Sequence, residues 1–245
     1  MISDAAEGVG QSVDGTLRQH GVFHESTLVH MPSNLSFVEA ATLTCSGLTA
    51  WNALFGLASK APKKGDVVVV QGTGGVSVAA LQFAVAAGAT VIALTSSPAK
   101  EARLRALGAT HTLNYRINPA WGSTIKPLTP QGKGAHLIVD VGGASTLAQS
   151  LAAIRPDGVI ACAGVLGEAP DGQVPSALDA LWAGCIVRAV VIGTRRMFRE
   201  MVDFVEREGV RPVVDERVFG FEEVREAYGY VGEARHFSKV GIGLW

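Results

Sequence analysis

Three glycines that follow a run of valines have the residue types and spacing that point most directly to chemistry. From Val67 the chain reads VVVVQGTGGVSVAALQFA, in which Gly72, Gly74 and Gly75 come shortly after four valines. Valines suit a strand buried on both faces, and glycines permit a tight turn with uncovered main-chain atoms. A diphosphate can bind the amides of such a turn and the unpaired N–H groups that open the next helix. The sequence therefore predicts a dinucleotide-binding crossover.

The elements that position these glycines alternate between strand and helix. Strands are predicted at residues 66–71, 90–95, 111–115, 135–141, 159–163 and 186–192. Helices are predicted at residues 75–87, 98–107 and 145–154, after a helical region over residues 40–57. We therefore expect an α/β fold with a doubly wound parallel sheet of about six strands, the Rossmann architecture.

The charges that follow the glycines favour NADP over NAD. An NAD site has an acid about twenty residues after the glycines, to bind the ribose hydroxyls. Here Asp66 is followed by no acid until Glu101, whereas Ser96, Lys100 and Arg116 lie near the ends of the next two strands. Hydroxyls and cations suit a 2′-phosphate. The alternative is that Lys100 and Arg116 are ordinary solvated charges.

Several motifs, in order, resemble the medium-chain dehydrogenase/reductase superfamily, in particular its zinc-independent alcohol dehydrogenase and quinone oxidoreductase-like members. The resemblance implies hydride transfer between NADP(H) and a small enone, quinone, carbonyl or alcohol substrate. The motifs are EAATLTCSGLTAWNALF, KKGDVVVVQGTGGVS, ALTSSPAKEARLRALGA, LNYR, VDVGGASTLAQSLAAIRPDGVIACAGVLG, VVIGTRRMF and RHFSKVGIGL.

The resemblance also implies a role for individual residues. Thr49, four residues after Cys45, matches a threonine near the nicotinamide and is the catalytic candidate, as a hydrogen-bond donor to the substrate. The alternatives are that Thr49 only packs within a helix and that Lys239 is an exposed strand charge. The implied cofactor contacts are Gly72, Gly74, Gly75, Val76, Ser77 and Lys239 at the pyrophosphate, Ser96, Lys100, Tyr115 and Arg116 at the adenosine phosphate, and Gly164, Val165 and Ile192 at the carboxamide.

The chain departs from that family at its amino-terminal end, where most of a GroES-like barrel domain is expected to be missing. We expect residues 1–45 to be a remnant of that domain with a linking helix, residues 46–214 to be the Rossmann domain and residues 215–245 to return to the remnant. Because the missing barrel carries much of the substrate pocket, an alternative function stays open. The chain would then be a non-redox enzyme (cyclase, lyase or isomerase) or a cofactor-binding protein.

Two other kinds of catalytic site receive less support. Cys45 matches a zinc-ligand position of zinc-dependent relatives, but closely spaced cysteine pairs and the H-E-x-x-H pattern are absent from the sequence, so we predict no metal site. The segment GVSVA around Ser77, with Asp215 and His236 later in the chain, matches an altered nucleophile elbow of hydrolases. The glycines before Ser77 already explain the turn, so a hydrolase is the weaker reading.

Composition agrees with a soluble enzyme-like domain, for which we expect a cytoplasmic location. The 245 residues are 48% hydrophobic with a formal net charge of −1, which provides no general attraction to nucleic acid. The amino terminus MISDAAEGVG lacks a basic and then apolar signal segment. Residues 76–94 are uncharged, but Gly88 divides them into a helix and a strand that are each too short to span a membrane. The resemblance also implies a homodimer joined through residues 186–192.

Overall fold

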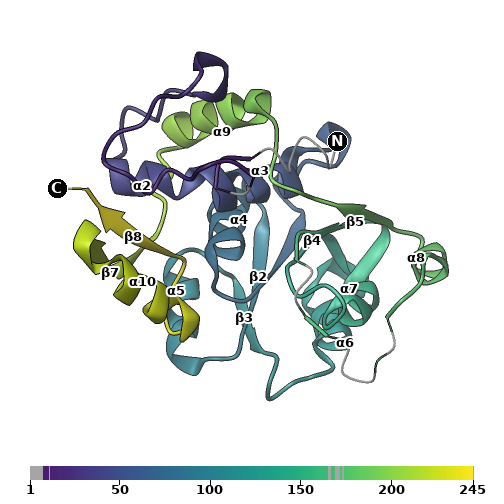
Figure 1. Ribbon diagram of the computed structural model, residues 1–245. Helices are drawn as coiled ribbons and strands as arrows, with labels where there is room; N and C mark the ends of the chain where they lie inside the picture. Colours follow the sequence, from purple (N-terminus) through teal and green to yellow (C-terminus); the bar gives the residue numbers. More distant parts are fainter. Residues whose placement is uncertain (1–7, 11, 165–166, 169–171, 173, 245) are drawn as a thin grey trace.

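A six-stranded parallel sheet forms the centre of the computed structural model (Figure 1). The structure describes residues 8–10, 12–164, 167–168, 172 and 174–244. The strand order is β3-β2-β1-β4-β5-β6, which confirms the predicted doubly wound α/β fold and places the switch point between β1 and β4. The strands are β1 Val67–Gln71, β2 Thr90–Thr95, β3 His111–Asn114, β4 Ala135–Asp140, β5 Ile154–Cys162 and β6 Ile186–Ala189.

Helices cover both faces of this sheet (Figure 1). One face packs against α3 (Leu48–Phe55), α4 (Gly75–Ala86), α5 (Pro98–Ala106) and α9 (Arg195–Glu208). The other face packs against α6 (Trp121–Ile125) and α7 (Leu147–Ala153), with α8 (Ala177–Ala183) beside them.

The valine run explains why the sheet carries two apolar layers. Successive side chains of a strand point to opposite faces. Val68 and Val70 accordingly belong to the core under α4, whereas Val67 and Val69 belong to the core under α6 and α7. All four side chains are at most 1% exposed, so β1 is buried on both faces as its sequence predicts.

A second, smaller sheet is formed by the carboxyl-terminal part of the chain. Strands β7 (Val214–Gly220) and β8 (Lys239–Gly243) pair in parallel, and α10 (Val224–Gly232) connects them. Helix α2 (Phe37–Ala41) contacts β8, so a segment from the amino-terminal part of the chain lies beside the small sheet (Figure 1). Short helical turns complete the described elements: Glu25–Thr27, Leu43–Gly47, Ala58–Lys60, Lys126–Leu128, Pro130–Gly132 and Phe221–Glu223.

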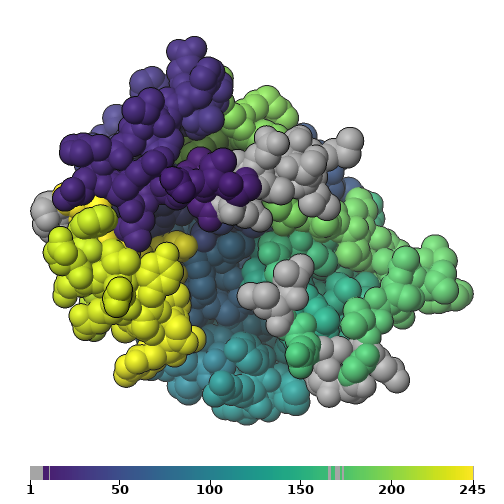
Figure 2. Space-filling view, in the orientation of Figure 1, coloured from purple at the N-terminus to yellow at the C-terminus, as the bar shows by residue number. Residues whose placement is uncertain are grey.

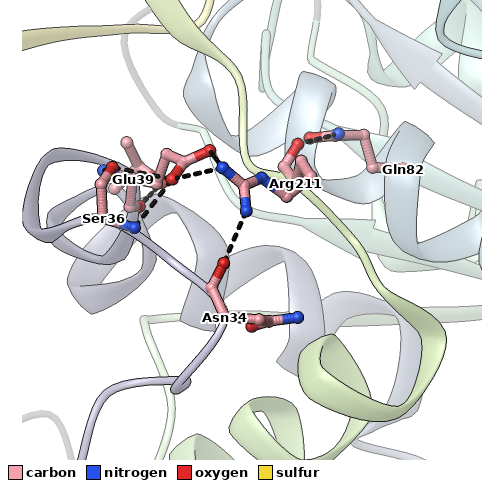
Figure 3. A network of polar contacts seen from close by, with 6 residues as sticks. Asn34, Ser36, Glu39, Gln82 and Arg211 are labelled. Atoms are coloured by element: carbon pink, nitrogen blue, oxygen red, sulfur yellow. Dashed lines mark hydrogen bonds and ion pairs between the residues drawn. The ribbon is translucent and has the colours of Figure 1, made fainter.

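Arg211 joins three distant segments of the chain (Figure 3). Its guanidinium donates to the Asn34 carbonyl at 2.5 Å and pairs with Glu39 at 2.9 Å, and its own carbonyl accepts a hydrogen bond from Gln82 on α4. Burial opposes ionisation of Glu39, but hydrogen bonds from Ser36 and the Arg211 charge together lower its pKa. We call these five residues the Arg211 clasp.

The largest differences between predicted and observed element boundaries occur in three places. The helical region expected at residues 40–57 is divided into α2, a π-helical turn at Leu43–Gly47 and α3. Strand β5 begins earlier than expected, at Ile154, and β6 ends at Ala189 rather than at Ile192. Among the described helices, none combines the length and apolarity needed to cross a bilayer.

Candidate cofactor site

The glycine turn between β1 and α4 leaves open space beside its main chain. Gly72 has a φ of +79°, in the left-handed region, and its N–H donates to the Leu94 carbonyl at 2.8 Å. A Cβ built on Gly72 or on Gly74 would meet no atom within 4 Å. Helix α4 begins at Gly75, and the first N–H groups of a helix have no partner within it. The turn therefore fits a diphosphate, which needs uncovered N–H donors and room.

Ser77 stabilises the turn with its side chain. Its hydroxyl is buried and donates to the Gln71 carbonyl at 2.5 Å, so only its main-chain N–H is left for a phosphate. Ser77 is only 2% exposed, and its hydroxyl is already bonded to the main chain. Such a hydroxyl is a poor nucleophile. The structure therefore contradicts the hydrolase reading of Ser77, Asp215 and His236.

A buried carboxylate lies at the switch point of the sheet. Asp140, at the end of β4, is 0% exposed and accepts hydrogen bonds from Ser150 at 2.6 Å, from Thr146 at 2.7 Å, from the Gly143 N–H at 2.9 Å and from Gln71 at 3.2 Å. Donors on β1, α7 and the loop after β4 thus meet at one group. The network fixes the shape of the crevice floor.

The residues of the Asp140 network lie within the quoted motifs but are not among the predicted site residues. The sequence holds a signal for it, because Gln71 and Asp140 are polar residues at the carboxyl ends of two apolar strands that are neighbours at the switch point. The charge of Asp140 also acts on Cys162: burial first, and Asp140 second, raise the pKa of this thiol to about 11. Cys162 is therefore protonated at neutral pH and inert as a nucleophile.

A cavity of about 1140 Å³ opens beside the glycine turn. Gly72 and Tyr115 both line it, together with Trp121 from α6 and Trp182 from α8. In the space-filling view, the blue part of the chain lies at the bottom of a hollow between the yellow carboxyl-terminal segment and the teal and green elements (Figure 2). The volume and the aromatic lining suit a planar base.

Lys239 lies beside the glycine turn, and Lys100 contacts the segment that precedes Lys239. Lys239 packs against Gly75, where any Cβ would collide with the lysine Cδ. Lys100, in the first turn of α5, donates from Nζ to the His236 carbonyl at 2.7 Å. Burial, and then the charge of Arg103, lower the pKa of Lys100, and a bound phosphate would offset both effects.

The other residues predicted at the adenosine phosphate follow the ends of β2 and β3. Ser96 is half-buried between β2 and α5, whereas Arg116 and Tyr115 are exposed. The Arg116 N–H donates to the Asn114 side chain at 3.0 Å, which shapes the turn after β3. No described polar contact joins the Arg116 side chain to Lys100, so their shared role stays a prediction.

The part of the chain predicted to contact the nicotinamide carboxamide has an unusual main-chain conformation at Ile192. Ile192 has a φ of +50°, which is strained for a β-branched residue. Its carbonyl accepts a hydrogen bond from Asn52 of α3 at 2.8 Å, and Asn52 in turn accepts one from Arg188 at 2.7 Å. Thr49 lies one turn before Asn52 on the same face of α3 and is 6% exposed. Helix α3 therefore brings Thr49 to the Ile192 side of the site.

Gly164 lies where the loop after β5 approaches the loop after β4. A Cβ at this position would collide with the Val141 carbonyl oxygen, so only glycine fits. Val165 lies outside the described residues. Cys45 is exposed in the π-helical turn, and the described part of the chain contains no group of three or more His, Cys, Asp or Glu residues that could hold a metal ion.

A doubly wound sheet with a glycine turn at its switch point defines a Rossmann-type dinucleotide-binding protein. The profile of the family described as zinc-binding dehydrogenase matches residues 75–207. The chain therefore belongs to this family of oxidoreductases, within the medium-chain dehydrogenase/reductase superfamily that its motifs resemble.

Individual relatives agree with this placement. The chain is 42% identical to a zinc-type alcohol dehydrogenase-like protein of Schizosaccharomyces pombe, over 96% of this chain and 68% of that protein. It is 32% identical to a zinc-type alcohol dehydrogenase-like protein of Leptosphaeria maculans, over 89% of this chain and 61% of that protein. A solved NAD-dependent alcohol dehydrogenase superposes with a TM-score of 0.86 at 33% identity, covering 97% of this chain and 67% of its own. The chain spans about two thirds of the length of these relatives.

Proposed function

We propose that this protein is an NADP(H)-dependent reductase that transfers hydride to a small enone, quinone or carbonyl compound, or from the corresponding alcohol. The observation that carries this proposal is the open glycine turn at the switch point, with Lys239 beside it and Lys100 held by the neighbouring His236 carbonyl. Bare amides and cations together suit a cofactor that carries a diphosphate and an additional phosphate. The solved relative at 33% identity is called NAD-dependent, which favours the other cofactor. A direct comparison of NADPH with NADH therefore decides this part of the proposal.

The residues of the chain have separable tasks in this proposal. The amides of Gly74 to Ser77 hold the diphosphate, and Lys100 binds the ribose phosphate. The Asp140 network and the Asn52 contact with Ile192 fix the crevice in which the nicotinamide ring lies. The bound cofactor supplies the hydride.

A conjugated alkene next to a carbonyl group is the substrate class whose reduction requires the fewest catalytic groups from the protein. Hydride adds to carbon, and the negative charge that develops on the carbonyl oxygen is stabilised by hydrogen-bond donors. Thr49 is our candidate for such a donor, because helix α3 brings it to the side of the site where Ile192 lies. The reaction direction follows from which cofactor form the substrate consumes.

Titration of the purified protein with NADPH and NADH, followed by tryptophan fluorescence, tests the cofactor. We expect NADPH to bind more tightly, and NADPH to be oxidised when enones or quinones are added. Lys100→Ala removes one charge-assisted hydrogen bond of about 1.5–3 kcal/mol, so NADPH affinity should fall about tenfold or more while NADH affinity changes little. Lys64→Ala, at an exposed lysine before β1, is the matched control.

The outcomes separate the competing functions. Equal losses of NADPH and NADH affinity in Lys100→Ala would contradict the phosphate role of this lysine. Binding without turnover of any enone, quinone, aldehyde or alcohol would favour a non-redox enzyme or a cofactor-binding protein. Failure to bind either nucleotide would rule out the proposed function.

A further inference from the structure

The segment that leads into β8 crosses the glycine turn, contains Lys239 and contacts Lys100. We call residues 236–239 the strap. The Ser238 N–H donates to the Thr73 carbonyl at 2.9 Å, inside the turn, and the Lys239 side chain packs on Gly75. The strap also supplies the His236 carbonyl that holds Lys100. The position of the strap therefore determines where Lys100 stands, whereas Lys239 is also held by its strand pairing with Val214 of β7.

One carboxylate fixes the strap to the rest of the small sheet. Asp215, the second residue of β7, is 6% exposed. Its Oδ2 accepts the Phe237 N–H at 2.7 Å, and its Oδ1 accepts the Arg217 N–H and the Tyr230 hydroxyl, both at 3.1 Å. Arg103 of α5 covers the Phe237 ring at 4.1 Å. Asp215 therefore connects strand β7, helix α10 and the strap.

The strap does not hold its conformation by packing alone. Ser238 has a φ of +66°, in the left-handed region that a serine rarely adopts. The Nδ1 atom of His236 is buried without a hydrogen-bond partner among the described residues. The strained main chain of Ser238 and the unpaired nitrogen of His236 both destabilise this conformation, so another contact must stabilise it. The hydrogen bond from the Phe237 N–H to Asp215 lies between Ser238 and His236 in the chain and is such a contact.

We infer that Asp215 is a positioning residue for recognition of the cofactor's ribose phosphate, because it anchors the strap whose His236 carbonyl holds Lys100. This inference rests on the proposed function. Asp215 touches neither cofactor nor substrate in this scheme and acts through Lys100. Loosening the strap lets the lysine side chain sample other rotamers, so phosphate binding has to order it again.

Asp215→Asn tests this inference, because it keeps the size of the side chain and replaces one acceptor oxygen with a donor. The amide must then face an N–H or hydroxyl donor, so one contact of the anchor is lost. We expect NADPH affinity to fall about fivefold to tenfold and NADH affinity to change less than twofold, as for loss of part of one charge-assisted hydrogen bond. Asp203→Asn, at an exposed aspartate of α9, is the matched control.

A double variant shows whether Asp215 acts through Lys100. In the Lys100→Ala background, Asp215→Asn should leave NADPH affinity unchanged, because the group that it positions is gone. A purely structural role predicts equal losses for NADPH and NADH, and the same loss with or without Lys100. Either result would overturn the inference.

Tyr230→Phe covers the case in which Asp215→Asn fails to fold. It keeps the carboxylate and removes one of its three donors, so the preference for NADPH should fall about twofold to threefold, less than in Asp215→Asn, because the Phe237 and Arg217 N–H groups still hold the carboxylate. Tyr228→Phe, at an exposed tyrosine of the same helix, should have no effect. An unchanged preference in Tyr230→Phe contradicts the inference. A wild-type protein without any preference for NADPH contradicts the proposed cofactor instead, so the two failures are distinguishable.

Discussion

Two glycines of the site differ in what a side chain at their position would contact. Gly164 cannot carry a side chain, because a Cβ would collide with the Val141 carbonyl oxygen. Gly74 could carry one, because its φ of −77° is ordinary and a Cβ would meet no atom within 4 Å. The folded chain itself therefore does not require glycine at position 74, and the space beside it is available to a ligand.

We predict that Gly74→Ala leaves the fold intact and weakens nucleotide binding. The added methyl group occupies the open side of the turn, where the diphosphate is proposed to lie. Thermal unfolding should shift by no more than a few degrees, as expected for a free-energy change below about 1 kcal/mol. NADPH and NADH affinity should both fall about tenfold or more, measured by fluorescence titration.

Gly164→Ala is the contrasting variant for this experiment. Its Cβ forces two loops apart, so it should lower the unfolding temperature and destabilise the protein by a few kcal/mol. If Gly74→Ala binds both nucleotides as tightly as the wild type, the diphosphate does not lie at this turn.

At the residue scale, the sequence predicted the part of the site that depends on local geometry. The turn at Gly72 follows from its neighbours in the chain, and so does the start of α4. The roles of Asp140 and Asp215 depend on donors that are distant in sequence, such as Gln71 for the first and Phe237 for the second. Such contacts exist only once the strands have taken their order, so local sequence patterns do not reveal them.

At the scale of elements, the boundaries were predictable where local signals and burial agree. Strand β2 has its predicted bounds, and β1 and α4 differ from theirs by one residue at one end. Strand β6 ends before its prediction because its partner β5 ends at Cys162, which pairs with Ala189. That constraint comes from another strand, and the apolar run itself does not reveal it.

A histidine links the amino-terminal ends of β1 and β4. The Val67 N–H donates to His136 Nδ1 at 2.9 Å, so this nitrogen must be unprotonated in the fold. Burial lowers the pKa of His136; Asp66 opposes the shift, and Arg155 adds to it. Protonation therefore breaks a hydrogen bond of the central strand.

We predict that stability decreases as the pH falls below about 6.5, the usual pKa of a histidine. The unfolded chain binds the proton more readily than the folded chain does, so the contribution of His136 is complete above that pH and is lost on acidification. Burial and the charge of Lys100 lower the pKa of His236 too, which adds to the effect.

Urea unfolding at about pH 8 and about pH 5 measures this dependence. His136→Gln keeps an acceptor for the Val67 N–H but does not titrate, so its midpoint should fall less on acidification than that of the wild type. His20→Gln, at an exposed histidine, should behave as the wild type does. A His136→Gln protein with the full acid sensitivity would refute this explanation.

At the scale of the whole molecule, the sheet ends in an apolar edge. Strand β6 is the last of the six, and Ile186 and Val187 on it are 38% and 39% exposed. Trp182 on the neighbouring α8 is 84% exposed. The proposed homodimer would pair this edge with the same edge of a second copy and so satisfy its unpaired main-chain groups.

We predict that light scattering detects a dimer and that Val187→Lys shifts it toward monomer by at least tenfold in Kd. Like charges would then face each other across the twofold axis of the interface. Val22→Lys introduces the same change at a valine that is 98% exposed, and it should leave the dimer intact. A wild-type protein that is monomeric at all concentrations would rule out the proposed assembly.

The Arg211 clasp affects the rate at which the folded protein unfolds. Its hydrogen bond to Asn34 joins residues 177 positions apart. Contacts across so long a loop carry a high closure entropy and form late, after the central strands have paired. We therefore expect the clasp to contribute little to the speed of folding. Its main effect is to slow the opening of the folded protein, because it must break before the barrier to unfolding is crossed.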